Sequence, residues 1–376
     1  MKHCTILEKN IVMERPDSLH NYFGWPSVTT LRDGTLAAVA SGFRFDHVCP
    51  FGKSVISYSY NGGKSWTEAA PVIDTILDDR DAGILNFGEN DVIFTSFNNS
   101  LDFQKGFFGD REGTNCDYAR AYLAHASRYP EKEAAVLGST FKFSRDGGKT
   151  WEKTIYRSPV TSPHGPMETK DGRLIYIGNA FGVKPSRIES WEIDGKTGAM
   201  TQLGTVPPIE NGSLPSHEPH AIELSDGRIL LIIRTEHQPA NPTWQNAYDL
   251  FTMYESISED GGRTWSVPAP ITLTEESAAE IEHGAIGAPP HLMRHSEGYL
   301  ILSCSARLRP FGINVLVSRD EGKTWEVYVL THDVPDTADL GYPATTELAD
   351  GSLYTVWYQH SALGEPAIIY GAHWTF

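Results

Sequence analysis

Short apolar runs separated by polar turns occur along the whole chain. The runs Arg228–Ile233 and Tyr299–Ser303 are examples, and each directly follows a two-residue turn signal. This pattern is typical of β-hairpins, in which Asp or Asn with Gly fills the turn. We therefore expect six units, each with several strands in series. Their turns are Asp33-Gly34, Asn90-Asp91 (without a glycine), Asp171-Gly172, Asp226-Gly227, Glu297-Gly298 and Asp350-Gly351.

A second signal is an octet that recurs four times. Its Asp can accept hydrogen bonds from turn amides, its Gly can take a positive φ, and its Trp can anchor the hairpin by packing. The spacings of 85, 114 and 60 residues correspond to one unit with an insertion, two units and one unit; a degraded copy lies near Asp194-Gly195. The four copies are Ser59-Tyr-Asn-Gly-Gly-Lys-Ser-Trp66, Ser144-Arg-Asp-Gly-Gly-Lys-Thr-Trp151, Ser258-Glu-Asp-Gly-Gly-Arg-Thr-Trp265 and Ser318-Arg-Asp-Glu-Gly-Lys-Thr-Trp325.

Six four-stranded units of this size predict an all-β fold, a six-bladed β-propeller forming a single domain over residues 1–376. We expect the early strand Thr5–Met13 to complete the last blade and close the ring. An insertion in the second blade covers roughly residues 99–138. Within it, Cys116–Tyr129 has the pattern of a short amphipathic helix that ends before Pro130.

Composition excludes several classes of partner. The formal net charge of −17 opposes general binding to nucleic acid or to an anionic lipid surface. No run approaches the roughly 18 apolar residues of a membrane span, and the first ten residues lack the apolar centre of a signal peptide, so we expect a cytoplasmic protein. The four scattered cysteines predict neither a disulfide framework nor a zinc site.

Strand order decides which face of the propeller can hold a site. The first strand of each unit begins on one face of the propeller. The loops between the second and third strands lie on the same face, and a site is expected there, near the axis. Counting eight residues back and forward from each turn Asp gives the positions expected there. The backward set is Trp25, Pro163, Glu218, Pro289 and Tyr342, with Asp81 within a residue of its slot, and the forward set is Ser41, Asn98, Asn179, Arg234, Ser305 and Tyr358.

The repeated octets are similar to the Asp-boxes of the sialidase superfamily, and the chain resembles a divergent member of it. The resemblance implies a catalytic pair, with Tyr342 as nucleophile and Glu218 accepting its proton. It also implies that two arginines bind a substrate carboxylate through their planar guanidinium groups. One is Arg234, and the other is Arg309 or Arg307. The same octets also occur in propellers without catalytic activity, so they indicate fold rather than chemistry.

Two positions depart from the sialidase pattern. Gly24, in Phe23-Gly-Trp-Pro26, stands where sialidases carry the first arginine of their carboxylate-binding triad. The loop expected to hold the acid/base Asp reads Ser41-Gly-Phe-Arg-Phe-Asp-His-Val-Cys-Pro50, where Arg44, Asp46 and His47 are the local substitutes. We take Asp46 as the acid/base candidate, and any one of Arg111, Arg120 and Arg128 of the insertion as a candidate to replace the missing arginine.

The leading prediction is a sialidase-like exo-glycosidase that acts on an acidic sugar, sialic acid or a related one, at a glycan end. Arg44, Trp25, Asp81, His164 and Tyr358 join the arginines as expected substrate-binding residues. One alternative is a hydrolase or lyase on another uronic-type sugar, with His and Tyr as acid and base; His217, His220, His283 and His291 also lie near first strands. The other is a carbohydrate-binding propeller without turnover. No cofactor or metal is implied; the expected partner is a small-molecule or oligosaccharide substrate, and a homo-oligomer stays open.

Overall fold

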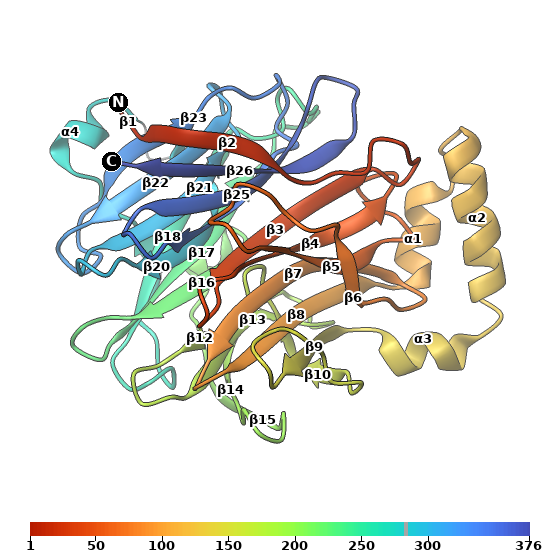
Figure 1. Cartoon of the computed structure of the whole chain (residues 1–376), viewed down its shortest axis with the longest axis horizontal. Coiled ribbons are helices and arrows are strands. Elements are labelled where there is room, and N and C mark those ends of the chain that lie inside the picture. The colour runs from red at the N-terminus through yellow and green to blue at the C-terminus, as the bar shows by residue number, and fades with distance from the viewer. Residues whose placement is uncertain (282–284) are drawn as a thin grey trace.

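The computed structural model forms six β-sheets that radiate as the blades of a propeller (Figure 1). The structure describes residues 1–281 and 285–376. In each blade the consecutive strands pair antiparallel, and the first strand lies nearest the axis. The predicted all-β, six-bladed fold is confirmed. Five of the predicted turns lie between the first and second strands of their blades, and the sixth, Asn90-Asp91, ends on the first residue of the second strand.

The first three blades follow one another along the chain. Blade 1 contains β3 (Tyr22–Thr30), β4 (Leu36–Arg44), β5 (Lys53–Ser59) and β6 (Ala70–Ile73). Blade 2 contains β7 (Asp78–Phe87), β8 (Asp91–Asn99), β9 (Ser139–Ser144) and β10 (Tyr156–Ser158). In blade 3 the inner strand is split into β11 (Val160–Thr161) and β12 (Met167–Glu168), followed by β13 (Leu174–Ala180), β14 (Ile188–Ile193) and β15 (Met200–Thr205).

The last three blades complete the ring. Blade 4 contains β16 (His217–Glu223), β17 (Ile229–His237), β18 (Leu250–Ser258) and β19 (Ala269–Pro270). Blade 5 contains β20 (Ala288–Arg294), β21 (Leu300–Ala306), β22 (Gly312–Ser318) and β23 (Glu326–Thr331), with β1 (Lys2–His3) added in parallel to β23. Blade 6 contains β24 (Gly341–Glu347), β25 (Leu353–His360) and β26 (Ala367–Thr375).

The N-terminal strand β2 (Thr5–Met13) supplies the outer strand of blade 6, as predicted. It pairs antiparallel with β26 from Thr5 opposite Thr375 to Met13 opposite Ile369. Strand β2 from the N-terminal part of the chain and strand β26 from the C-terminal part therefore lie side by side in one sheet (Figure 1). Closure by a strand from the other end of the chain leaves the ring without a gap between its first and last blades.

The octets form the turns before the outer strands of four blades and hold them in two ways. In the second copy, Asp146 Oδ1 accepts the Thr150 amide at 2.8 Å and the Ser144 hydroxyl at 2.8 Å. The tryptophans pack across blade boundaries: the Trp265 indole N–H, for example, points to Ser190 of the preceding blade at 3.3 Å. The degraded copy at Asp194 makes the equivalent turn of blade 3, where its carboxylate accepts two backbone amides.

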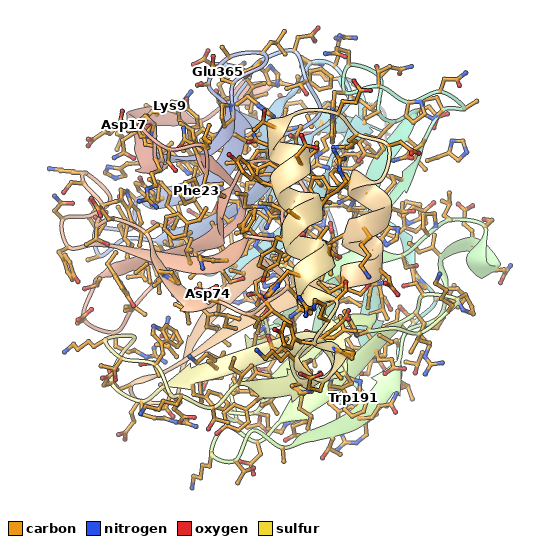
Figure 2. All side chains as sticks on the ribbon, turned by 90° about the vertical axis from the view of Figure 1, so that its right-hand side faces the viewer. Lys9, Asp17, Phe23, Asp74, Trp191 and Glu365 are labelled. Carbon is orange, nitrogen blue, oxygen red and sulfur yellow. The ribbon has the colours of Figure 1, made fainter. Side chains whose placement is uncertain are left out.

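The insertion between β8 and β9 forms three helices beside the propeller: α1 (Leu101–Phe108), α2 (Thr114–Ala126) and α3 (Pro130–Val136). They lie at one side in Figure 1, and Figure 2 shows α1 and α2 in front of the sheets when that side faces the viewer. Two shorter helices, η1 (Ile209–Gly212) and α4 (Glu275–Ala278), lie outside the blades. No helix of the described residues is long and apolar enough to cross a membrane.

Candidate active site

The inner strands carry a bulge where they approach the axis. The register with the second strand shifts between Gly24 and Ser27 in blade 1, and at the matching place in blades 2, 4, 5 and 6. A bulge re-aims a side chain and is common beside active sites. Positive φ between 43° and 71° occurs at four of these bulges, at Trp25, Asp81, Glu218 and Tyr342, and also at His164, which lies between β11 and β12 of blade 3. Four belong to the predicted ring, and His164 takes the place of its neighbour Pro163.

The bulges of blades 4 and 6 bring Glu218 and Tyr342 together. The Tyr342 hydroxyl donates to Glu218 Oε1 at 2.5 Å. Burial tends to raise the pKa of Glu218, but the positive charge of Arg234 and the Tyr342 hydrogen bond bring it below the usual value. Burial and the nearby Glu218 charge raise the pKa of Tyr342 well above its usual value. The pair is thus a neutral phenol beside an ionised carboxylate, and an attack by the phenol oxygen would pass its proton to Glu218.

Arg234 orients this pair from β17. It donates to Glu218 Oε2 at 2.5 Å and to the Tyr342 hydroxyl at 3.2 Å. Its Nε donates to Glu236 at 2.7 Å, so two carboxylates share this guanidinium. Arg234 follows from the sequence spacing, because the register pairs it with His217, the residue before Glu218.

Arg307 is a buried cation of a different kind. It directly follows β21, is 6% exposed, and donates to the Leu340 carbonyl at 2.8 Å and the Tyr358 hydroxyl at 3.3 Å. Its guanidinium carbon lies 5.5 Å from the centre of the Tyr342 ring. Among residues 1–281 and 285–376, no carboxylate forms an ion pair with it. A buried guanidinium without an acid partner favours an anionic ligand.

Arg80 and Asp81 reach the axis from blade 2. Arg80 stacks over Trp25, with its guanidinium carbon 4.2 Å from the ring centre, and lies within electrostatic reach of Tyr342 and Tyr22. Its nearest carboxylate contacts are long, 3.6 Å to Asp78 and 3.9 Å to Asp81. Arg80 therefore supplies a third arginine to the centre where Gly24 leaves none.

The carboxyl group of Asp81 is almost wholly buried, and its Oδ1 has no hydrogen-bond partner within the described part of the chain. Burial raises the pKa of Asp81 to about 7; the Arg80 charge offsets part of this effect and the Glu218 charge adds to it. A carboxyl group that is protonated near neutral pH beside an ionised carboxylate is the arrangement expected of a general acid with its partner base. The sequence placed Asp81 at the ring as a binding residue only.

Asp339 is the centre of a second hydrogen-bond network, beside the Tyr342–Glu218 pair. It accepts hydrogen bonds from Tyr358 at 2.9 Å and Tyr22 at 3.1 Å, contacts His360 at 2.8 Å, and lies 3.6 Å from His47. Burial tends to raise the pKa of Asp339, but the two histidines hold it far below the usual value. Tyr358 thus links this network to Arg307. The sequence did not single out Asp339, whose turn between blades carries no recurring motif.

Two predicted site residues do not join the pair. Arg309 lies at the surface, more than half exposed, and makes a two-pronged contact with Asp336 at 2.7 and 2.9 Å. Asp46 is partly exposed and pairs with Arg111 of the insertion at 3.1 Å. Neither contacts Glu218 or Tyr342, and Arg111 is therefore engaged at the rim rather than at the missing triad position.

Arg44 and the histidines take supporting positions. Arg44 is fully buried against Asp78 at 2.6 Å, lies 5.1 Å from the Trp25 ring centre and donates to the His47 carbonyl. His164, His220 and His291 pack together behind Tyr342, on the axis. His217 is 3.8 Å from Glu236, and His283 lies outside the described residues. Within the described ranges, no group of three or more His, Cys, Asp or Glu residues is arranged to hold a metal ion.

The fold and the four octets define the class of protein, a propeller built from BNR repeats. The family model described as "BNR repeat-like domain" matches residues 122–356. The chain therefore belongs to the BNR repeat-like domain family, and the resemblance to a divergent sialidase/BNR-repeat superfamily member is confirmed. Among curated proteins, none matches the chain.

Solved structures of the same fold cover nearly all of the chain. A protein of unknown function from Dyadobacter fermentans is 18% identical with a TM-score of 0.73, and the match covers 100% of both chains. The intramolecular trans-sialidase from Ruminococcus gnavus is 14% identical (TM-score 0.63, covering 99% of this chain and 98% of that one). An α-L-arabinanase from Penicillium chrysogenum is 13% identical (TM-score 0.64, covering 99% and 98%). At these identities the similarity shows that the chain shares the propeller fold of glycoside hydrolases.

Proposed function

We propose that this protein is an exo-glycosidase that releases an acidic sugar, sialic acid or a related one, from a glycan end. The observation that carries the proposal is the 2.5 Å contact between buried Tyr342 and half-buried Glu218, beside Arg307, which lacks an acid partner among the described residues. A substrate carboxylate would complete the charge balance of Arg307. An anionic nucleophile would be repelled by such a substrate, whereas the neutral phenol of Tyr342 would not.

The proposed mechanism has two steps. Tyr342 Oη attacks the anomeric carbon and passes its proton to Glu218, while Asp81 donates a proton to the leaving oxygen. Water then attacks the anomeric carbon and breaks its bond to Tyr342 Oη. Asp81 takes a proton from that water, and the departing phenolate regains its proton from Glu218. Arg307, Arg234 and Arg80 hold the substrate carboxylate.

A second candidate is a hydrolase or lyase on another uronic-type sugar with His/Tyr acid–base chemistry. The observation that favours it is His47, in the loop after β4, which lies against Asp339 and close to the Tyr22 hydroxyl. Burial lowers the pKa of His47, which suits a base at neutral pH. A lyase would give an unsaturated uronate, which absorbs ultraviolet light, whereas a hydrolase would not.

The test is turnover of an activated aryl sialoside, beside aryl uronides and neutral aryl glycosides. Sialoside turnover that falls about 10²–10⁴-fold in both Tyr342→Phe and Glu218→Gln is the expected result. Tyr60→Phe and Glu365→Gln are matched controls, because both side chains are exposed at the surface. Equal turnover in all four variants would overturn the catalytic roles. Uronide turnover alone would favour the second candidate, and glycan binding without any turnover would favour a binding propeller.

A further inference from the structure

A cavity of about 360 Å³ occupies the propeller axis on the side of the histidines away from the catalytic pair. The inner strands of all six blades line it, from Val28 and Thr29 of β3 to Thr345 and Thr346 of β24. Its inner end is formed by His164, His220 and His291, and the His164 ring centre lies 6.5 Å from that of Tyr342. The proposed reaction does not use this cavity.

The three histidine rings form one cluster. His220 and His291 stack with ring centres 4.8 Å apart, and His164 packs edgewise at 5.8 Å from His220 and 5.0 Å from His291. All three are more than nine-tenths buried. Burial lowers the pKa of His220 to about 4 and the pKa values of His164 and His291 well below the usual range, so the free cluster is neutral at pH 7.

Backbone hydrogen bonds fix the tautomers of two rings. His220 Nδ1 accepts the Leu292 amide at 2.9 Å, and His291 Nδ1 accepts the Thr345 amide at 3.3 Å. A neutral imidazole whose Nδ1 accepts must carry its proton on Nε2. Nε2 of each ring thus carries an N–H group and has no free lone pair. This favours a ligand that accepts hydrogen bonds over a metal ion.

His164 differs because its Nδ1 faces the Ser27 hydroxyl, at 3.4 Å, rather than an amide. A hydroxyl can accept as well as donate, so Nδ1 of His164 can hold a proton without losing its partner. Its Nε2 is buried and has no hydrogen-bond partner among the described residues. His164 is therefore the one ring of the three that can become doubly protonated at small cost in hydrogen bonds.

A second proton on His164 would make this ring positively charged, and no nearby carboxylate is available to balance that charge among the described residues. Arg32 and Glu168 line the cavity, with Arg32 Nη2 4.0 Å from Glu168 Oε2, and Tyr342 lies behind His164. No carboxylate contributes to the pKa shifts of the three histidines. An imidazolium there needs an anion from solution.

We propose that the axial cavity binds a small inorganic anion through the Nε2–H groups of His164, His220 and His291, together with one proton taken up by His164. This site is separate from the arginine cluster that faces the proposed substrate. Because a bound anion stabilises the protonated ring, its affinity should rise as the pH falls.

Thermal unfolding in sodium bromide, exchanged for sodium gluconate at constant ionic strength, tests this proposal. At about pH 5.5 bromide should raise Tm by several degrees, and at about pH 8 by clearly less. His164→Asn should abolish both the rise and its pH dependence. Asn tolerates the positive φ of this position, so the substitution suits the backbone. A bromide-soaked crystal of the wild-type protein should show an anomalous peak among the three rings.

His295→Asn is the matched control, since His295 is equally buried but packs on Tyr299 outside the cavity. It should keep the full bromide response. If His164→Asn fails to fold, His220→Asn replaces it, because the Asn oxygen can still accept the Leu292 amide while the Nε2–H is lost. A bromide response equal in all variants, no response at either pH, an anomalous peak elsewhere only, or stabilisation by zinc instead of bromide would each overturn the proposal.

Discussion

At the scale of single residues, backbone strain is concentrated where the candidate chemistry lies. Trp25, Asp81, Glu218 and Tyr342 have positive φ at inner-strand bulges, and His164 has positive φ between β11 and β12. Each such conformation costs about 1–3 kcal/mol for a non-glycine residue and persists only where its surroundings enforce it. Glycine would remove that cost at each position. These five positions nevertheless carry side chains, and those side chains lie near one another at the propeller axis. This supports a functional role for the five residues.

The acid role of Asp81 predicts a specific pH profile. Because the pKa of Asp81 is raised to about 7, its protonated fraction falls as the pH rises through that value, and kcat should fall with it. Asp81→Asn should remove this limb and lower kcat for an unactivated sialoside about 10²–10⁴-fold. An activated aryl sialoside should lose much less, since its leaving group needs little protonation. An unchanged alkaline limb in Asp81→Asn would assign that limb to another group.

The same substitution should change stability in a defined direction. The folded pKa of Asp81 lies above its unfolded value, so its contribution is fully present below the unfolded pKa and is lost as the pH rises to about 7. Urea unfolding of Asp81→Asn should therefore show a smaller loss of stability than wild type between about pH 4 and pH 7.

Arg307 and Arg44 are both buried, but we expect opposite behaviour on substitution. Arg44→Gln leaves fully buried Asp78 without its closest partner and should lower the free energy of unfolding by about 3–5 kcal/mol. Arg307→Gln strands no described carboxylate, so stability should stay near wild type while KM for the acidic substrate rises about 10–100-fold. Urea unfolding and steady-state kinetics measure both effects. Equal destabilisation by the two substitutions would make Arg307 a structural residue.

Counting residues from the hairpin turns predicts that Glu218, Tyr342 and Arg234 lie near the axis, as they do in the structure. The count works because the turn sets the register between the first and second strands of each blade. It does not reveal Arg80, since the bulge between Arg80 and Gly83 changes which side chains face the axis. The choice between Arg307 and Arg309 also needs the structure. Arg307 is held by the end of β21, whereas Arg309 lies in the following turn, where Asp336 draws it to the surface.

At the scale of elements, the local patterns that specify turns were the most informative. Asp146, Asp260 and Asp320 each accept a backbone amide and a threonine hydroxyl within their own octet, so these turns need no distant partner to form. The fourth copy keeps the shape even though Glu321 replaces the first glycine and takes φ 62°. Blade 6 has no octet because its third and fourth strands come from opposite ends of the chain.

The insertion shows where periodicity is a weaker guide. The buried positions Cys116, Ala119, Leu123 and Ala126 follow the helical pattern, so the sequence predicts the presence of α2 but not its exact bounds. The predicted end at Tyr129 is three residues too late, because Ser127 caps α2 and Tyr129 instead precedes α3 with Pro130 in its first turn. Helices α1 and α3 have eight and seven residues, which is too short for a clear periodic signal.

At the scale of the whole molecule, the ring depends on a strand from the far end of the chain. Strand β2 pairs with β26 across its full length, and the same blade carries Tyr342 at the start of β24. A variant lacking residues 1–13 would expose the edge of β26 and open the ring between blades 6 and 1. We expect it to lose cooperative thermal unfolding and to aggregate. Removal of Lys2–His3 alone, which deletes only the short β1 edge, should cost a few degrees of Tm at most.

A circular permutant separates the need for the strand from the need for its position in the sequence. Thr5 lies opposite Thr375, so a short glycine–serine linker can join residue 376 to residue 1. New ends between Lys196 and Thr197 fall in an exposed turn between β14 and β15. Since every blade keeps all its strands, the permutant should unfold cooperatively within a few degrees of wild type, in contrast to the 1–13 deletion. A deletion variant that melts like wild type, or a permutant that fails as the deletion does, would show that closure by β2 does not hold the ring together.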